Sequence, residues 1–157
     1  LYGSQLQLNY QYLRPQLYSE YDIMDTDAII ASALDIVGDK WSLLIIRDML
    51  VKHKKTFKEI SESDERIAPS ILSARLKLLE SYKLIFKTKV PDNKKENLYL
   101  LTEKGIRLTP IIIEFSLWGN SNMREFNEID DIEGLNSDKN LIIETFQDRY
   151  NSMLLNF

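Results

Sequence analysis

The chain of 157 residues contains no cysteine and a single histidine, His53. Without cysteine there can be no disulfide, no cysteine-ligated metal site and no cysteine nucleophile, which fits a reducing compartment. His53 lies in a basic run, Lys-His-Lys-Lys, that predicts a solvated turn, so a general-base role is not favoured. The sequence also has no glycine-rich phosphate loop, nucleophile motif or cluster of metal ligands. These absences argue against an enzyme, and we expect neither a cofactor nor a metal.

Long apolar runs are also missing from the sequence. No stretch approaches the ~20 residues of a membrane span, and no secretory signal is visible, so we expect no membrane partner. Hydrophobic residues make up 44% of the chain and charged residues 28%, which is ordinary for one globular domain of this length.

Acidic and basic residues are distributed unevenly along the chain. Residues 40–104 contain fifteen Lys and Arg against nine Asp and Glu, a net charge of +6, whereas the remainder contains five against fifteen, a net charge of −10. A polyanion-binding surface on an acidic scaffold would produce this pattern. Chance clustering of charge is the alternative.

The chain begins with a tyrosine-rich arm. Residues 1–27 hold five of the eight tyrosines and predict no firm structure. Whether residues 1–23 are native stays open, because Met24 would also serve as a start.

Two helices are expected after this arm. Residues 28–37 have apolar side chains at helical spacing and end at Gly38. Asp39 supplies the cap for a second helix over residues 40–51. The basic run over residues 52–55 follows that helix.

A short helix, a turn and a longer helix follow. Thr56 and Glu59 form a capping-box pattern that starts the short helix. After a polar turn, Pro69 suits the first position of a helix over residues 69–82, although Ala68 stands where a Ser or Asp cap would be expected. This order is typical of a helix-turn-helix.

The helix over residues 69–82 has two unlike faces. Three leucines recur at helical period and predict the buried stripe: Leu72, Leu76 and Leu79. The opposite side carries small and weakly basic residues: Ser70, Ser73, Ala74 and Lys77. Small side chains allow close approach, hydroxyls can donate to phosphates or base edges, and lysine supplies charge. An ordinary amphipathic helix with a solvated face is the alternative.

Two strands joined by a basic turn are expected next. Residues 84–90 alternate between apolar and polar side chains, a turn covers residues 91–96, and residues 97–101 return. A hairpin that follows a helix-turn-helix indicates a wing. Leu98 and Leu100 would be exposed unless another segment covers them, and the N-terminal arm is one candidate.

The last third of the chain predicts helices that need a partner. Residues 111–118 are too apolar all round for the surface helix of a monomer. Residues 125–138 hold six acids and no base, which indicates a linker between a domain over residues 28–124 and a helix over residues 139–157. The apolar stripe of that last helix consists of Ile142, Phe146, Tyr150 and Met153.

Four short motifs occur in order: Leu-Asp-Ile-Val-Gly-Asp-Lys-Trp from Leu34, Phe-Lys-Glu-Ile from Phe57, Pro-Ser-Ile-Leu-Ser-Ala-Arg-Leu from Pro69, and Leu-Thr-Glu-Lys-Gly from Leu101. Each is weak alone, but as a set with matching spacing they are specific. Together they resemble the HxlR-type winged helix-turn-helix regulators, over residues 28–119.

The resemblance implies a mainly α fold with a small β-hairpin wing, that is, a winged helix-turn-helix with terminal dimerisation helices. It implies a dimeric bacterial or archaeal transcription regulator that acts in the cytoplasm, at the nucleoid, on double-stranded DNA. The helix over residues 69–82 would enter the major groove, and the wing would lie along the backbone. The residues assigned to DNA are Ser70, Ser73, Ala74, Arg75, Lys77, Lys87, Lys89, Lys94 and Lys95. Arg75, at the flank, could instead pair with an acid of the protein.

The resemblance also implies a homodimer. Its contacts are assigned to Ile29, Ile30, Ala33, Phe115, Trp118, Ile142, Phe146, Tyr150 and Met153. Two central helices related by a two-fold axis would bind an inverted-repeat operator. The operator, the regulated genes, repression or activation, and any small-molecule effector stay open.

Three positions depart from the family's usual pattern. Asp39 replaces the second glycine of Gly-Gly-Lys-Trp, and Ala74 stands where a glutamine that reads adenine is common. Many members carry a sensing cysteine where this chain has Ala28, so thiol sensing is not expected. A winged-helix module for protein interaction, without DNA binding, is the alternative function.

Overall fold

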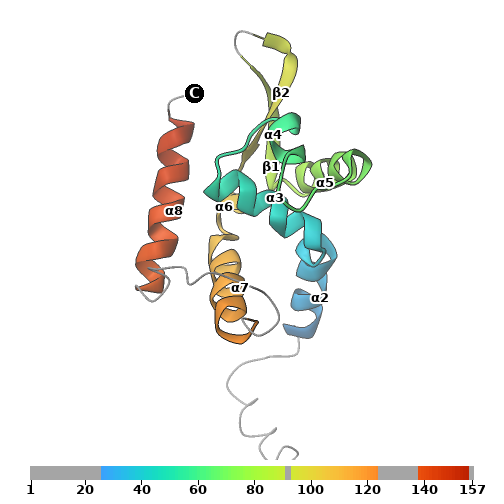
Figure 1. Ribbon diagram of the computed structural model, residues 1–157. Helices are drawn as coiled ribbons and strands as arrows, with labels where there is room; N and C mark the ends of the chain where they lie inside the picture. The colour runs from blue at the N-terminus through green and yellow to red at the C-terminus, as the bar shows by residue number, and fades with distance from the viewer. Residues whose placement is uncertain (1–25, 91–92, 124–137, 156–157) are drawn as a thin grey trace, which may run out of the picture. The chain divides into compact units, whose positions relative to one another are not determined.

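The computed structural model describes residues 26–90, 93–123 and 138–155, and the chain divides into two units, residues 1–35 and 36–157. The elements are α2 (Thr26–Val37), α3 (Lys40–Val51), α4 (Phe57–Ser61), α5 (Pro69–Ser81), β1 (Ile85–Val90), β2 (Asn93–Leu101), α6 (Glu103–Ile106), α7 (Thr109–Asn122) and α8 (Lys139–Leu154) (Figure 1). This mainly helical fold with one antiparallel hairpin confirms the predicted fold class. Of the expected arm over residues 1–27, residues 1–25 lie outside the described residues, and residues 26 and 27 belong to α2. The acidic linker also lies outside the described residues, except Asp138.

The first unit contains most of α2. The helix begins two residues earlier than predicted and ends at Val37, before Gly38, as expected. Its apolar side chains Ile29, Ile30 and Leu34 are exposed.

The core of the second unit is formed by α3, α5 and the base of the hairpin. α3 begins where predicted because the Asp39 carboxylate accepts hydrogen bonds from the backbone N–H groups of Trp41 (3.0 Å) and Ser42 (3.1 Å). Trp41 and Leu44 of this helix are only half-buried. The largest fully buried apolar side chains of this region are Ile46, Met49, Leu50, Ile60, Leu72, Leu79, Ile85 and Leu101.

A tight backbone reversal connects α5 to the hairpin. Lys83 has φ 58°, and the N–H of Leu84 donates to the carbonyl of Leu79 at 2.9 Å, which closes the C-terminus of α5. Gly105 of α6 lies against this reversal, because a Cβ there would come within 2.2 Å of the Leu84 carbonyl oxygen. This close contact holds α6 against the start of the wing.

The hairpin is longer than the sequence predicts. β2 begins at Asn93 instead of Asn97, and the pairing continues up to a bulge between Lys89 and Val90. Leu98 and Leu100 are buried, each with 4% of its surface exposed. Other parts of the chain therefore cover the hairpin at both positions.

α8 packs against its own chain. Tyr150 is 1% exposed, and its hydroxyl accepts a hydrogen bond from the backbone N–H of Leu101 at 2.8 Å. Phe146 and Met153 pack against the same core, and α8 contacts α3 and α7. The stripe assigned to a dimer contact from the sequence therefore faces this chain's own core. Among the residues that the structure describes, no helix has the length and apolarity needed to cross a membrane.

Candidate nucleic-acid interface

α5 presents the small polar face that the sequence predicts. Its three leucines are buried, with Leu72 and Leu79 0% exposed and Leu76 2% exposed. On the other side of the helix, Ser70, Ala74 and Lys77 are exposed, and Ser73 is half-buried. The leucine stripe thus anchors α5 while the opposite face stays open to a ligand.

Ile71 belongs to this surface too, and the sequence reasoning missed it. It is 37% exposed and follows Ser70 on the outer side of the first turn. Its position off the leucine stripe was the available signal. An apolar side chain at this place can contact the methyl group of a thymine, which neither a serine hydroxyl nor a lysine does well.

The start of α5 has backbone donors without a side-chain cap. Ala68 is extended, with φ −64° and ψ 138°. Its methyl side chain has no oxygen that could accept a hydrogen bond from the helix, and no side-chain cap is present. Pro69 occupies the first turn and lacks an N–H of its own. The remaining N–H groups of that turn are suited to a phosphate oxygen.

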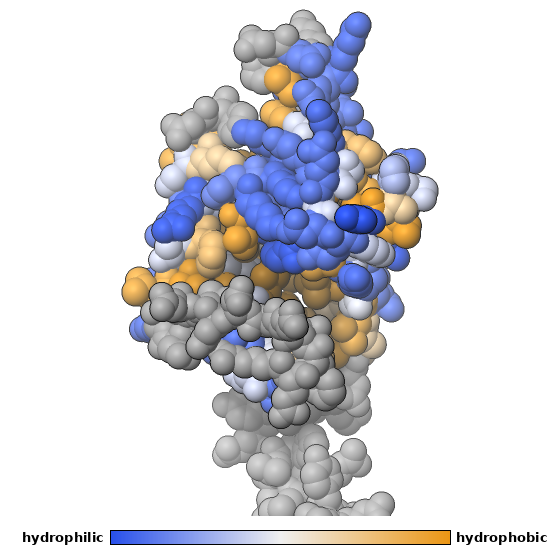
Figure 2. Space-filling view, in the orientation of Figure 1, coloured by the Kyte–Doolittle hydropathy of each residue, from blue (hydrophilic) through white to orange (hydrophobic). Residues whose placement is uncertain are grey.

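The wing adds lysines beside α5. Lys87 and Lys89 are exposed on one face of β1, opposite Tyr99 and Asn97 of β2, and Lys95 is exposed on β2. The side chain of Lys94 lies outside the described residues. Hydrophilic side chains extend along the hairpin at the top of the view (Figure 2).

Arg75 contacts an acid of the protein. Its Nε lies 3.2 Å from a carboxylate oxygen of Asp39, and the arginine side chain is 35% exposed. The same carboxylate caps α3 and accepts the hydroxyl of Ser42. Of the two alternatives that the sequence left for Arg75, the structure thus contains the internal pair. Asp39, the departure from the family's glycine, links the start of α3 to α5.

A buried carboxylate orders the turn between α4 and α5. Asp48 is 1% exposed and binds Arg47 at 2.6 Å, Lys54 at 3.0 Å and the hydroxyl of Ser63. Burial by itself would raise the pKa of Asp48, but the hydrogen bonds from Ser63, Arg47 and Lys54 outweigh it and hold the pKa below its usual range. The basic run expected to be a solvated turn is therefore partly structural, because Lys54 and Lys52 both lie within 4 Å of this carboxylate.

A second ion pair completes the support of the turn. Arg47 donates to both carboxylate oxygens of Glu65, at 2.7 Å and 3.0 Å. This hydrogen bonding is the main reason why the pKa of Arg47 rises and that of Glu65 falls from their ordinary values. Because Glu65 lies just before α5, the pair fixes where the helix begins relative to α3.

The residues assigned to the dimer in α7 and in α8 differ in their exposure. Phe115 and Trp118 of α7 are 61% and 59% exposed, and Ile111 beside them is 42% exposed. Exposed aromatic side chains on one helix face form an apolar patch that water solvates poorly. Within α8, by contrast, Tyr150 is buried and Ile142 is half-buried. Of these two helices, only α7 has its assigned residues open to a partner without movement of α8.

The sequence matches a known family over more than half of its length. A family model described as HxlR-like helix-turn-helix matches residues 36–127. The HTH-type transcriptional regulator YodB of Bacillus subtilis is 35% identical over 89 residues, which are 57% of this chain and 79% of YodB. An uncharacterised HTH-type transcriptional regulator of Methanothermobacter thermautotrophicus is 34% identical over 107 residues, covering 65% of this chain and 81% of that protein.

Solved structures show the same likeness. The redox regulator HypR in its reduced form has a TM-score of 0.52 and 28% identity, over 64% of this chain and 98% of HypR. The reduced form of the transcriptional regulator YodB from B. subtilis has a TM-score of 0.50 and 29% identity, over 62% of this chain and 94% of YodB.

Proposed function

Because the chain belongs to the HxlR-like helix-turn-helix family, we propose that it regulates transcription as a homodimer bound to an inverted repeat in double-stranded DNA. DNA-binding regulation follows from the family model and from relatives that are HTH-type transcriptional regulators. Relatives of this kind favour a regulator over an enzyme. Such a regulator would act in the cytoplasm, at the nucleoid. The homodimer, the inverted repeat and the residue roles below are our own proposals.

The observation that carries the residue roles is the open face of α5 beside an exposed basic hairpin. Small outer side chains let an α-helix lie close to the base edges of the major groove, and Ser70 and Ala74 are small and exposed. The exposed Lys77 adds a positive charge to the same face. Lys87 and Lys89 of the adjoining strand would then lie along the phosphates. In this arrangement α5 reads base edges while the wing supplies sequence-independent affinity.

Base readout by this helix should be modest. Ala74 cannot make the paired hydrogen bonds to adenine that a glutamine or asparagine makes. The remaining direct readers would be Lys77, the serine hydroxyls and the apolar edge of Ile71. Phosphate contacts are therefore expected to contribute a large share of the binding free energy, which makes binding strongly dependent on salt.

The apolar patch of α7 supports the homodimer. A two-fold partner seated on Ile111, Phe115 and Trp118 would remove these side chains from water. Ile29 and Ile30 of α2, which are exposed, are proposed as dimer contacts too. Two α5 helices related by this axis would reach successive major grooves about 34 Å apart, so half-sites should lie about 10 bp apart from centre to centre, or at a multiple of the helical turn.

The DNA part is tested by the salt dependence of binding to duplex DNA. Replacing Lys87 and Lys89 by alanine should flatten the slope of log K against log salt by about one to two units per protomer, because each neutralised phosphate contributes about −0.9. A matched variant, Lys139→Ala with Arg149→Ala in α8, should keep the wild-type slope. A flat slope for the unaltered protein would support the protein-interaction module instead.

The dimer part is tested by sedimentation without DNA. Trp118→Glu places a charge in the apolar patch and should produce monomers at micromolar concentration, whereas Tyr82→Glu, outside α7, should leave dimers. Deleting α8 is a poorer test, because it removes the buried Tyr150. If the unaltered chain sediments as a monomer at micromolar concentration, the proposed homodimer is wrong.

A further inference from the structure

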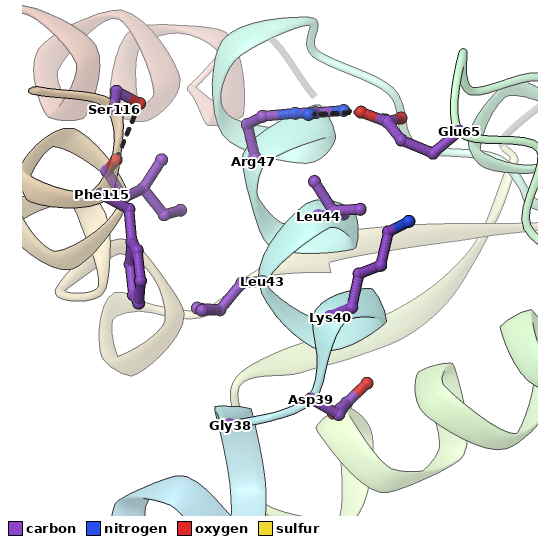
Figure 3. A pocket seen from close by; sticks show the side chains of 10 residues that line it. Gly38, Asp39, Lys40, Leu43, Leu44, Arg47, Glu65, Phe115 and Ser116 are labelled. Atoms are coloured by element: carbon purple, nitrogen blue, oxygen red, sulfur yellow. Dashed lines mark hydrogen bonds and ion pairs between the residues drawn. The ribbon is translucent and has the colours of Figure 1, made fainter. Parts of the chain in front are cut away.

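A cleft of about 650 Å³ lies between α3 and α7. One part of its lining is apolar, with Leu43 and Phe115 pointing toward one another across the opening (Figure 3). The remaining lining carries charge, from Asp39, Lys40, Arg47 and Glu65. A volume of this size, with apolar walls and a few convergent polar groups, is typical of a site for a small organic ligand.

Three of the four charged side chains that line the cleft already have ion-pair partners. Asp39 is paired with Arg75, and Arg47 is paired with Glu65 and Asp48. The ammonium group of Lys40 lies 5.0 Å from the centre of the Trp41 ring, and within the described ranges it has no carboxylate partner. A ligand with one negative charge would therefore be matched by Lys40 without breaking an existing ion pair.

We propose that the cleft binds a small organic anion with an apolar body. Its anionic group lies at Lys40, and its body packs against Leu43, Leu44 and Phe115, whose apolar surfaces it covers. An uncharged or cationic molecule of the same shape gains only the apolar part of this interaction.

A second copy of the chain is a poorer occupant of this cleft. Interface cores between proteins are depleted in charged residues, whereas four charged side chains line the cleft. The neighbouring face of α7, with Ile111 and Trp118, is the apolar surface that suits a protein partner. The two sites share Phe115 but differ in chemistry.

The cleft is connected to α5 by its own lining residues. Asp39 holds Arg75 of α5, and Glu65, bound to Arg47, lies just before α5. An added negative charge beside Lys40 repels the carboxylates of Asp39 and Glu65, which weakens their hold on the start of α5 without replacing either ion pair. Occupancy is therefore expected to lower DNA affinity, and by linkage DNA lowers ligand affinity equally. This second step rests on the proposed DNA-binding function.

The binding step is tested with the full chain and without DNA. We would titrate ¹⁵N-labelled protein with 4-phenylbutyrate and, as a neutral match, with 4-phenylbutan-1-ol. The acid should bind with an affinity of about millimolar order and shift the amide signals of Lys40, Leu43 and Phe115. Lys40→Met should weaken the acid about two- to fivefold, the range of exposed ion pairs, and leave the alcohol unchanged. Lys58→Met, on α4, should alter neither.

Three outcomes would overturn the ligand site. They are equal affinity for acid and alcohol, shifts confined to the outer face of α7 around Trp118, and cleft amides that respond only to dilution because a second copy fills the cleft. The coupling is measured separately, as the affinity for a duplex with and without saturating 4-phenylbutyrate. Unchanged duplex affinity, with the acid bound, would refute the coupling alone. If the protein without the acid binds no duplex, the proposed function is refuted and the ligand site is not.

Discussion

Replacing Tyr150 by phenylalanine tests whether α8 belongs to its own chain's core. The substitution keeps the ring and removes only the hydroxyl, which accepts the N–H of Leu101 at 2.8 Å. Both residues are essentially buried, so the N–H of Leu101 would be left without a partner and without water. An unsatisfied buried donor costs about 1–3 kcal/mol, which is the expected loss in the free energy of unfolding near neutral pH.

The alkaline range gives an independent measure of the burial of Tyr150. Burial raises the pKa of Tyr150 from 10.0 to about 12, a difference that corresponds to about 3 kcal/mol between the folded and unfolded states. Because the folded pKa is the higher one, this stabilisation is fully present below pH 10 and is lost as the pH rises through 12. Phenylalanine cannot ionise, so the gap in stability between wild type and variant should shrink over this range.

Urea denaturation followed by circular dichroism at a fixed protein concentration, at neutral and alkaline pH, measures both effects. The matched control is Tyr82→Phe, because Tyr82 is 41% exposed and its loss of a hydroxyl should change little. Tyrosinate absorbance should show one tyrosine that ionises only as the pH approaches about 12, and Tyr150→Phe should remove it. If Tyr150→Phe matches Tyr82→Phe at every pH, α8 is not docked on this core.

Three further predictions concern the DNA-binding region. Lys77→Ala should weaken a cognate site more than random duplex, by about 1–3 kcal/mol if a base contact is lost, and equal losses in binding assays on both duplexes would place Lys77 on phosphate. Asp48→Asn should lower the free energy of unfolding by about 3–5 kcal/mol, because Arg47 and Lys54 lose a buried partner. The pKa of Asp48 is lowered in the folded state, so its contribution to the free energy of unfolding is present above the unfolded pKa and is lost as the pH falls through the folded pKa. Asp48→Asn has no carboxylate at this position, so its stability should not show this loss in an acid titration. Diamide at doses that spare methionine should leave DNA binding unchanged, since the chain has no thiol; loss of binding in a mobility-shift assay would show another chemistry.

The beginnings of the helices could be predicted from the sequence because capping acts over a few residues. Asp39 caps α3, the Thr56–Glu59 capping box starts α4, and Pro69 opens α5, all where the sequence indicates. The leucine stripe of α5 was predictable for a related reason, since helical period alone decides which side chains share a face. Strand ends were less accessible: β2 begins at Asn93 because strand ends depend on pairing with β1, a partner outside the local window.

The polar support of the candidate site was decided by tertiary structure alone. Arg47 and Lys52 are neighbours of Asp48 in the sequence, but its burial and its hydrogen bond with Ser63, 15 positions away, depend on the folded chain. The same holds for Tyr150, whose partner is 49 positions away, and for the pairing of Arg75 with Asp39. The sequence determined the order of elements, their caps and their apolar faces through interactions between neighbours. Which polar groups meet, and hence which lysines and arginines remain open to DNA, depends on chain packing that brings distant residues within hydrogen-bond distance.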